Sequence, residues 1–130
     1  MSTPALDTAT GTDILAETKE WKAELIQCKH YLEEWMQELA IVINKNSLLR
    51  IDREIKHFNG LFMRNRIMSC GLLSELKAWE KVLAYQFFDI LHIDEKLLHD
   101  HKILGERMVA YRKLHHELKT EFQSFIENWE

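Results

Sequence analysis

The 130-residue chain contains very little proline or glycine, with one of the former and four of the latter. The single proline, Pro4, lies among the first 11 residues. Because these two residue types most often interrupt helices and begin turns, their scarcity after residue 12 predicts long helices. Hydrophobic residues make up 46% and charged residues 29% of the chain. This balance is typical of a folded protein and disfavours a disordered one.

Long apolar runs and an excess of positive charge are also missing. No apolar stretch approaches the roughly 18–20 residues that cross a bilayer, so we expect no membrane segment. The formal net charge is −4 and the basic residues are interspersed with acidic ones, which disfavours nucleic-acid binding. The start of the chain, MSTPALDTATGTD, lacks the basic and apolar parts of a secretory signal, so we expect a cytoplasmic protein.

Cysteine is scarce as well. Cys28 and Cys70 occur at no spacing typical of a metal or redox motif. We expect two reduced, partly buried thiols in a cytoplasmic protein, with a structural disulfide as the alternative.

The chain does contain hydrophobic positions spaced alternately by four and three residues, which is the pattern of a helix with one buried stripe. This stripe runs from Ile14 to Val42, from Leu48 to Leu83 and from Leu97 to Trp129. It predicts helices near residues 13–45, 47–91 and 95–129. We expect residues 1–11 to form a flexible tail and residues 12–130 to form one helical domain. We expect an all-α, elongated antiparallel three-helix bundle or coiled coil with a long central helix.

The central helix contains Gly60 and Gly71, each of which costs about 1 kcal/mol relative to alanine. A break near Asn59–Gly60 is therefore one interpretation. The other is a single helix of about 44 residues, which we favour because the heptad spacing continues unchanged through Gly60.

Polar residues interrupt the buried stripe of the central helix at Asn65 and Ser69. Counting back from the first connection places Cys28 beside them. We expect these three residues to form a hydrogen-bonded polar core layer that fixes the alignment of the helices. The alternative is a redox-sensing thiol at Cys28, although no nearby basic cluster is evident to lower its pKa.

Seven histidines raise the possibility of a metal site. The densest group, with neighbouring carboxylates, contains His92, His99 and His101, which are weak candidate ligands for zinc, iron or manganese. The paired Glu-x-x-His motifs of di-iron bundles are missing, so we expect no metal and no cofactor. His101 and His115 occupy stripe positions of the third helix. We expect them to be partly buried and hydrogen-bonded across the bundle, or else to form a pH-sensitive packing layer.

The second connection is rich in apolar residues. With the predicted lengths, the first helix begins too late to cover this end of the bundle, which leaves an exposed apolar patch. We expect a contact surface for a second copy or another protein, or an internal hydrophobic plug. Its residues are Tyr85, Phe87, Phe88, Ile90, Leu91 and Ile93.

Two segments, HFNGLFMRNR (57–66) and ERMVAYRKLHHELKTEFQSFIENW (106–129), are similar to an uncharacterised family of small all-helical bacterial proteins. The family patterns are HFxxxF and [FY]RKxxHELKxEF, and the similarity covers most of residues 17–130. His57, Phe58 and Phe62 match the first pattern. The second is matched by His116, Glu117, Leu118, Lys119, Glu121 and Phe122. The resemblance implies a helical fold and no activity. Relatives carry histidines where this chain has Ser74 and Trp79, which disfavours a shared metal site.

No catalytic motif is evident in the sequence. A slender helical bundle rarely forms the pocket of convergent polar groups that catalysis requires. We therefore expect a non-enzymatic protein–protein interaction or scaffold protein, with an unidentified protein partner or a weak homodimer. The alternative is a metal-binding or redox-sensing bundle.

Overall fold

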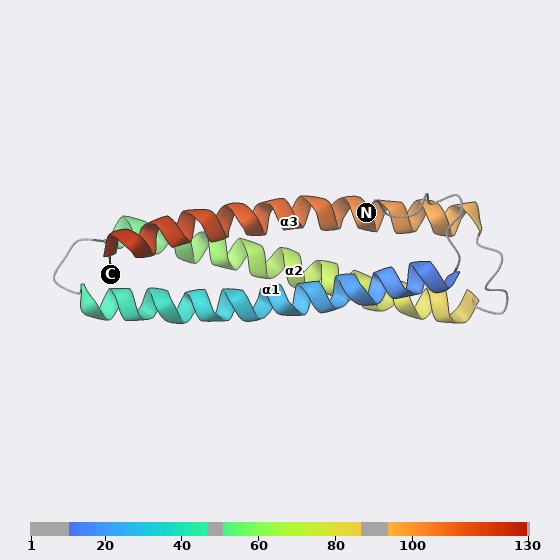
Figure 1. Ribbon diagram of the computed structural model, residues 1–130, viewed down its shortest axis with the longest axis horizontal. Coiled ribbons are helices and arrows are strands. Elements are labelled where there is room, and N and C mark those ends of the chain that lie inside the picture. Colours follow the sequence, from blue (N-terminus) through green and yellow to red (C-terminus); the bar gives the residue numbers. More distant parts are fainter. Residues whose placement is uncertain (1–10, 47–50, 87–93, 130) are drawn as a thin grey trace.

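The computed structural model describes residues 11–46, 51–86 and 94–129, and these form three long helices (Figure 1). They are α1 (Gly11–Lys45), α2 (Asp52–Gln86) and α3 (Glu95–Trp129), each of 35 residues. α1 and α3 run in the same direction and α2 runs in the opposite one. No strand occurs in the described ranges. The predicted all-α, antiparallel three-helix fold is confirmed.

The lengths of the helices differ from the sequence prediction. Each helix spans about 52 Å at 1.5 Å per residue, so the described part of α2 is no longer than its neighbours. α2 begins at Asp52, one residue after the non-helical Ile51 and later than the predicted residue 47. Asp52 and Glu54 in its first turn favour this start, because carboxylates stabilise the positive end of the helix dipole. The predicted continuation over 87–91 lies outside the described residues.

The predicted end of α1 and both predicted ends of α3 agree with the structure, whereas α1 begins at Gly11, two residues before its predicted start. α1 ends at Lys45, where the Asn46 amide and side chain both donate to the Val42 carbonyl. Asp94 precedes α3 and accepts a hydrogen bond from the Lys96 amide at 3.2 Å, as a helix cap does. α2 continues without a break through Gly60, so the single-helix interpretation is confirmed.

The core follows the predicted stripe closely. In α1, all nine stripe residues from Ile14 to Val42 are buried. In α2, the stripe from Ile51 to Leu83 is buried except for the half-buried Ile55. In α3, six stripe residues are buried: His101, Met108, Tyr111, Leu118, Phe122 and Phe125. The side chains of α2 pack mainly on α1, whereas α1 and α3 contact each other less extensively.

The expectation that one end of the bundle lacks cover is wrong for the described residues. α1 begins at Gly11, and Ile14 packs against Trp79 and Leu83 of α2. Leu97 and Leu98 of α3 pack against the same cluster. Over the described residues the three helices are of equal length, so α1 reaches the described end of α2.

Candidate functional site

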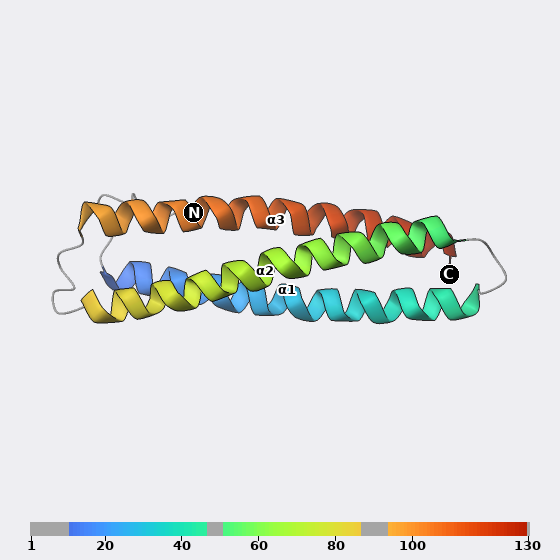
Figure 2. The same cartoon turned by 180° about the vertical axis from the view of Figure 1, so that it is seen from behind.

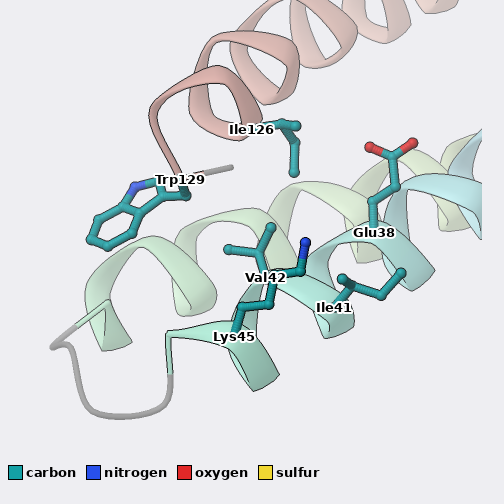
Figure 3. A pocket seen from close by; sticks show the side chains of 6 residues that line it. All are labelled: Glu38, Ile41, Val42, Lys45, Ile126 and Trp129. Carbon is teal, nitrogen blue, oxygen red and sulfur yellow. The ribbon is translucent and has the colours of Figure 1, made fainter.

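A groove lies between α1 and α3, near the ends of both helices (Figure 3). Its first section is a cavity of about 210 Å³ lined by Glu38, Ile41, Val42, Lys45, Ile126 and Trp129. A second section, of about 330 Å³, is lined by Trp35, Glu38, Phe122, Gln123, Ile126 and Glu127. The two sections share Glu38 and Ile126 and therefore form one depression, which we call the α1–α3 groove.

The α1–α3 groove has a mixed lining, with apolar side chains at its base and polar atoms over much of the exposed surface of its second section. Val42 of α1 and Phe122 of α3 are fully buried at its floor. Ile126 points from α3 toward α1 in Figure 3, and it packs, like Trp129, against the aromatic core beneath. Ile41 on the α1 wall is 53% exposed. An apolar side chain entering the groove would therefore meet apolar atoms on both walls.

Aromatic rings lie beside the groove toward the middle of the bundle. The Trp35 ring stacks on His115 with centroids 5.1 Å apart, and Tyr31 lies 6.4 Å from the same histidine. At the other end, the Asn46 side chain donates to the Trp129 carbonyl at 3.4 Å. From Trp35 to Lys45 the groove therefore follows 11 residues of α1, or about 15 Å of helix.

The walls of the groove are acidic. Residues 30–44 of α1 contain three glutamates and neither lysine nor arginine, and residues 120–129 of α3 contain two glutamates and again no lysine or arginine. Glu38 and Glu127 line the cavity itself, and Glu34 lies one turn before Glu38 on the same helix face. Lys45, at the mouth, is the basic side chain among the lining residues. Sequence reasoning missed this groove, although the long stretch without basic residues was a usable signal.

The structure brings together the predicted polar core layer. Cys28, Asn65 and Ser69 are all buried in the middle of the bundle. Tyr111 of α3 is buried near Cys28 and Ser69; burial strongly raises the pKa of its hydroxyl, which has no hydrogen-bond partner among the described residues. The Ser69 hydroxyl donates to the Arg66 carbonyl at 3.1 Å. The Asn65 side-chain oxygen has no hydrogen-bond partner among the described residues, so the layer is not fully hydrogen-bonded as predicted.

The two cysteines are both free thiols in different environments. Burial raises the pKa of Cys28, and the nearby Glu24 carboxylate raises it further. A raised pKa lowers the fraction of reactive thiolate at neutral pH, which weakens the redox interpretation of Cys28. Cys70 is exposed on α2, so the expectation that it is partly buried is wrong.

The structure does not assemble the weak metal candidates. His99 is exposed at the start of α3, whereas His101 is buried in the core. His92 lies outside the described residues. Over the described ranges, no group of three or more histidine, cysteine, aspartate or glutamate side chains has a geometry that suits a metal ion.

His101 is instead part of a buried polar cluster between all three helices. The Trp79 indole N–H donates to Nδ1 of His101 at 3.0 Å, and Nε2 lies 2.7 Å from a Glu17 carboxylate oxygen. Because an indole N–H can only donate, Nδ1 is an acceptor and the ring proton sits on Nε2. Trp21 stacks on the imidazole at 4.6 Å. The predicted hydrogen bonding across the bundle is confirmed for His101.

His115, the second histidine on the buried stripe, differs from His101 in its hydrogen bonding. Its ring is half-buried against Trp35, and its Nδ1 atom is buried without a hydrogen-bond partner among the described residues. The predicted hydrogen bond is therefore wrong for that atom. Burial lowers the pKa of both histidines, with the Glu17 carboxylate partly opposing this for His101 and Lys119 adding to it for His115.

The predicted contact surface at the second connection is only partly described. Tyr85 is 82% exposed near the end of α2. Phe87, Phe88, Ile90, Leu91 and Ile93 lie outside the described residues. The contact surface therefore stays a prediction. It was based on the expectation that the first helix leaves this end of the bundle uncovered, and that expectation is wrong for the described residues.

In comparisons with known proteins, no family model, curated protein or solved structure matches this chain. The resemblance carried by HFNGLFMRNR and the last helix therefore stays an expectation. Among the described helices, none is long and apolar enough to cross a membrane.

Proposed function

We propose that this protein is a non-enzymatic interaction protein of the cytoplasm that holds an amphipathic helix of a protein partner in its α1–α3 groove. The observation that supports this most directly is the combination of an apolar floor with acidic walls along about 15 Å of α1, beside the parallel α3. The free thiols of Cys28 and Cys70 are consistent with a reducing compartment.

The shape of the groove favours a helix over an extended peptide or a small molecule. Helices dock in apolar grooves through side chains three or four residues apart, and this groove offers apolar contacts at Ile41, Val42 and Ile126. Its length corresponds to about 11 residues, or about three helical turns. Because no sheet edge occurs in the described ranges, strand addition is not an available recognition mode there.

The charge of the groove defines the chemistry of the partner. Glu34, Glu38 and Glu127 lie along the walls, so a helix with lysine or arginine beside its apolar stripe would be complementary. The floor residues are already buried, and the apolar surface still to be covered is small. We therefore expect a weak, transient complex of the smaller interface class.

A metal-binding or redox-sensing bundle has less support. Both ring nitrogens of His101 are engaged, one by Trp79 and the other by Glu17. Ligation by this histidine would require breaking one of these buried hydrogen bonds. The raised pKa of Cys28 likewise disfavours thiolate chemistry.

A model peptide tests the proposal. The probe is a fluorescein-labelled helical peptide of about 15 residues, with leucine at three- and four-residue spacing and lysine on both flanks, and its anisotropy reports binding. We expect Glu38→Lys and Ile41→Ser each to weaken binding by about tenfold, the usual effect of removing one good contact. Glu33→Lys and Val109→Ser make the same changes outside the groove and serve as matched controls. Equal effects of the groove and control variants, or equal binding of a scrambled peptide, would reject the groove as the site.

A further inference from the structure

The outward face of α2 carries a second apolar stripe that this chain does not cover. Gly60, Met63, Ile67, Cys70 and Ser74 follow one another at alternating spacings of three and four residues, and all are exposed. Met63 is 58% exposed and Ile67 is 64% exposed. Since the core stripe of α2 runs through Phe62, Asn65 and Ser69, this second stripe lies on the opposite side of the helix.

The glycines of this face have no role in the packing of the described residues. A Cβ atom added at Gly60 or Gly71 would meet nothing within 4 Å. Residues 11 apart are separated by about three turns, so the two glycines lie above one another on the same face. Glycine destabilises a helix interior, but it allows another backbone to approach closely. Together with the exposed Met63 and Ile67, this composition is typical of a helix that receives a neighbour.

The charge of the face is opposite to that of the α1–α3 groove. Between Glu54 and Glu75, α2 contains no aspartate or glutamate, while it contains Lys56, Arg64 and Arg66. It is thus an amphipathic helix surface with basic residues beside an apolar stripe, which is the chemistry that the acidic groove selects. The segment from Lys56 to Cys70 has 15 residues, which is enough to span the α1 wall of the groove from Trp35 to Lys45.

We infer that the partner of the groove is a second copy of this chain, whose outward α2 face, centred on Met63 and Ile67, docks in the α1–α3 groove. This inference rests on the proposed function and names its partner. A symmetric contact between two α2 faces is disfavoured, because it would place Lys56, Arg64 and their counterparts in the same interface. An acidic helix from a different protein is the competing occupant of the α2 face.

The geometry makes this contact head-to-tail. α1 and α3 lie toward the viewer in Figure 1, whereas α2 lies in front in Figure 2, so the groove and the α2 face are on opposite sides of the bundle. A contact between two different surfaces of identical subunits does not close on itself unless the rotation between them closes a ring. Self-association should therefore continue beyond the dimer as the protein concentration rises.

Analytical ultracentrifugation of the full chain over a wide concentration range tests this inference. We expect the weight-average mass of the wild type to rise past that of a dimer. Ile67→Glu places a carboxylate on the α2 face, and Glu38→Lys places a cation in the groove, so each variant alone should stay monomeric. Val109→Glu, at a position that is 61% exposed on α3, and Glu33→Lys are the matched controls and should behave as the wild type. Circular dichroism melts confirm folding, and Met63→Glu and Glu127→Lys form a second pair.

Mixing the two variants gives the decisive measurement. The Ile67→Glu protein keeps an intact groove and the Glu38→Lys protein keeps an intact α2 face, so an equal mixture should form dimers and no larger species. A monomeric wild type at every concentration, a dimer that Ile67→Glu abolishes and Glu38→Lys leaves intact, or a mixture without dimers would each overturn the inference. If the wild type stays monomeric while the lysine-flanked peptide still binds the groove, the proposed function stands and only the identity of the partner is wrong.

Discussion

Trp79 donates its indole N–H to Nδ1 of His101 across 3.0 Å in the core of the bundle. This single contact determines which ring nitrogen carries the proton, and it leaves no site for a second proton unless the bond breaks. The imidazole is thereby kept neutral between an indole donor and the Glu17 carboxylate.

The first prediction is a loss of stability in mild acid. The pKa values of His101 and His115 are lowered in the folded state, whereas in the unfolded chain a histidine titrates near pH 6.5. The unfolded state therefore binds more protons below about pH 6.5, and the free energy of unfolding falls as the pH drops through that value. Each histidine contributes at most about 1.4 kcal/mol per pH unit in this window. Urea unfolding at pH 8, 7, 6 and 5 measures the effect, and His101→Gln should reduce the slope; an unchanged slope would show that His101 does not contribute.

The second prediction concerns Trp79, whose indole N–H donates to His101. Trp79→Phe leaves Nδ1 of His101 buried and unpaired, which should lower the free energy of unfolding by about 1–3 kcal/mol more than the accompanying loss of volume does. Trp35→Phe removes a similar volume from a buried tryptophan and serves as the control. Urea unfolding at pH 8, where the histidines are neutral, measures both. Equal costs for the two variants would argue that the hydrogen bond has no net effect.

The third prediction uses the polar core layer. Asn65 is buried, and its side-chain oxygen has no partner among the described residues, so Asn65→Leu, which keeps the number and branching of the heavy atoms, should raise the free energy of unfolding by about 1–2 kcal/mol. Ser69→Leu adds volume beside Tyr111 and Cys28 and should destabilise the protein. If Asn65 instead fixes helix alignment, its replacement should also broaden the distribution of oligomeric states in size-exclusion chromatography. A less stable Asn65→Leu variant would contradict the account of an unpaired oxygen.

The fourth prediction compares three glycines inside helices. Gly60→Ala and Gly71→Ala introduce a methyl group into open space and should each stabilise the protein by about 0.5–1 kcal/mol. At Gly105, the added Cβ would lie 3.2 Å from the Trp21 ring, so Gly105→Ala should gain less or lose stability. Thermal melts of the three variants under identical conditions measure the difference. Equal gains at all three positions would mean that the Trp21 ring can move without cost.

The buried stripe of the fold was predictable from sequence because heptad spacing reports directly which residues face inward. It located Ile14 to Val42 in α1 and placed Asn65 in the core of α2. It also placed Trp79 and His101 in the core, but not the bond between them. Glu17, the third member of that cluster, lies outside the stripe and gave no signal.

The α1–α3 groove was not predictable by the same means. Heptad spacing indicates the direction of Val42 and Phe122, but it does not report how far apart two helices lie at their ends. The contact between Ile14 of α1 and Leu83 of α2 was also not predicted. Which residues of two helices lie opposite each other depends on where each helix begins, and periodicity does not give that. Helix ends depend on local backbone geometry, which heptad spacing does not report.

Three of the four tryptophans lie against a histidine ring: Trp21 and Trp79 at His101, and Trp35 at His115. A protonated imidazole beside an indole withdraws electron density from its excited state and quenches its emission, whereas the neutral ring does so far less. We therefore expect the tryptophan fluorescence of the chain to fall when its two core histidines are protonated. The protonation of these two histidines can thus be followed by tryptophan emission without any added label.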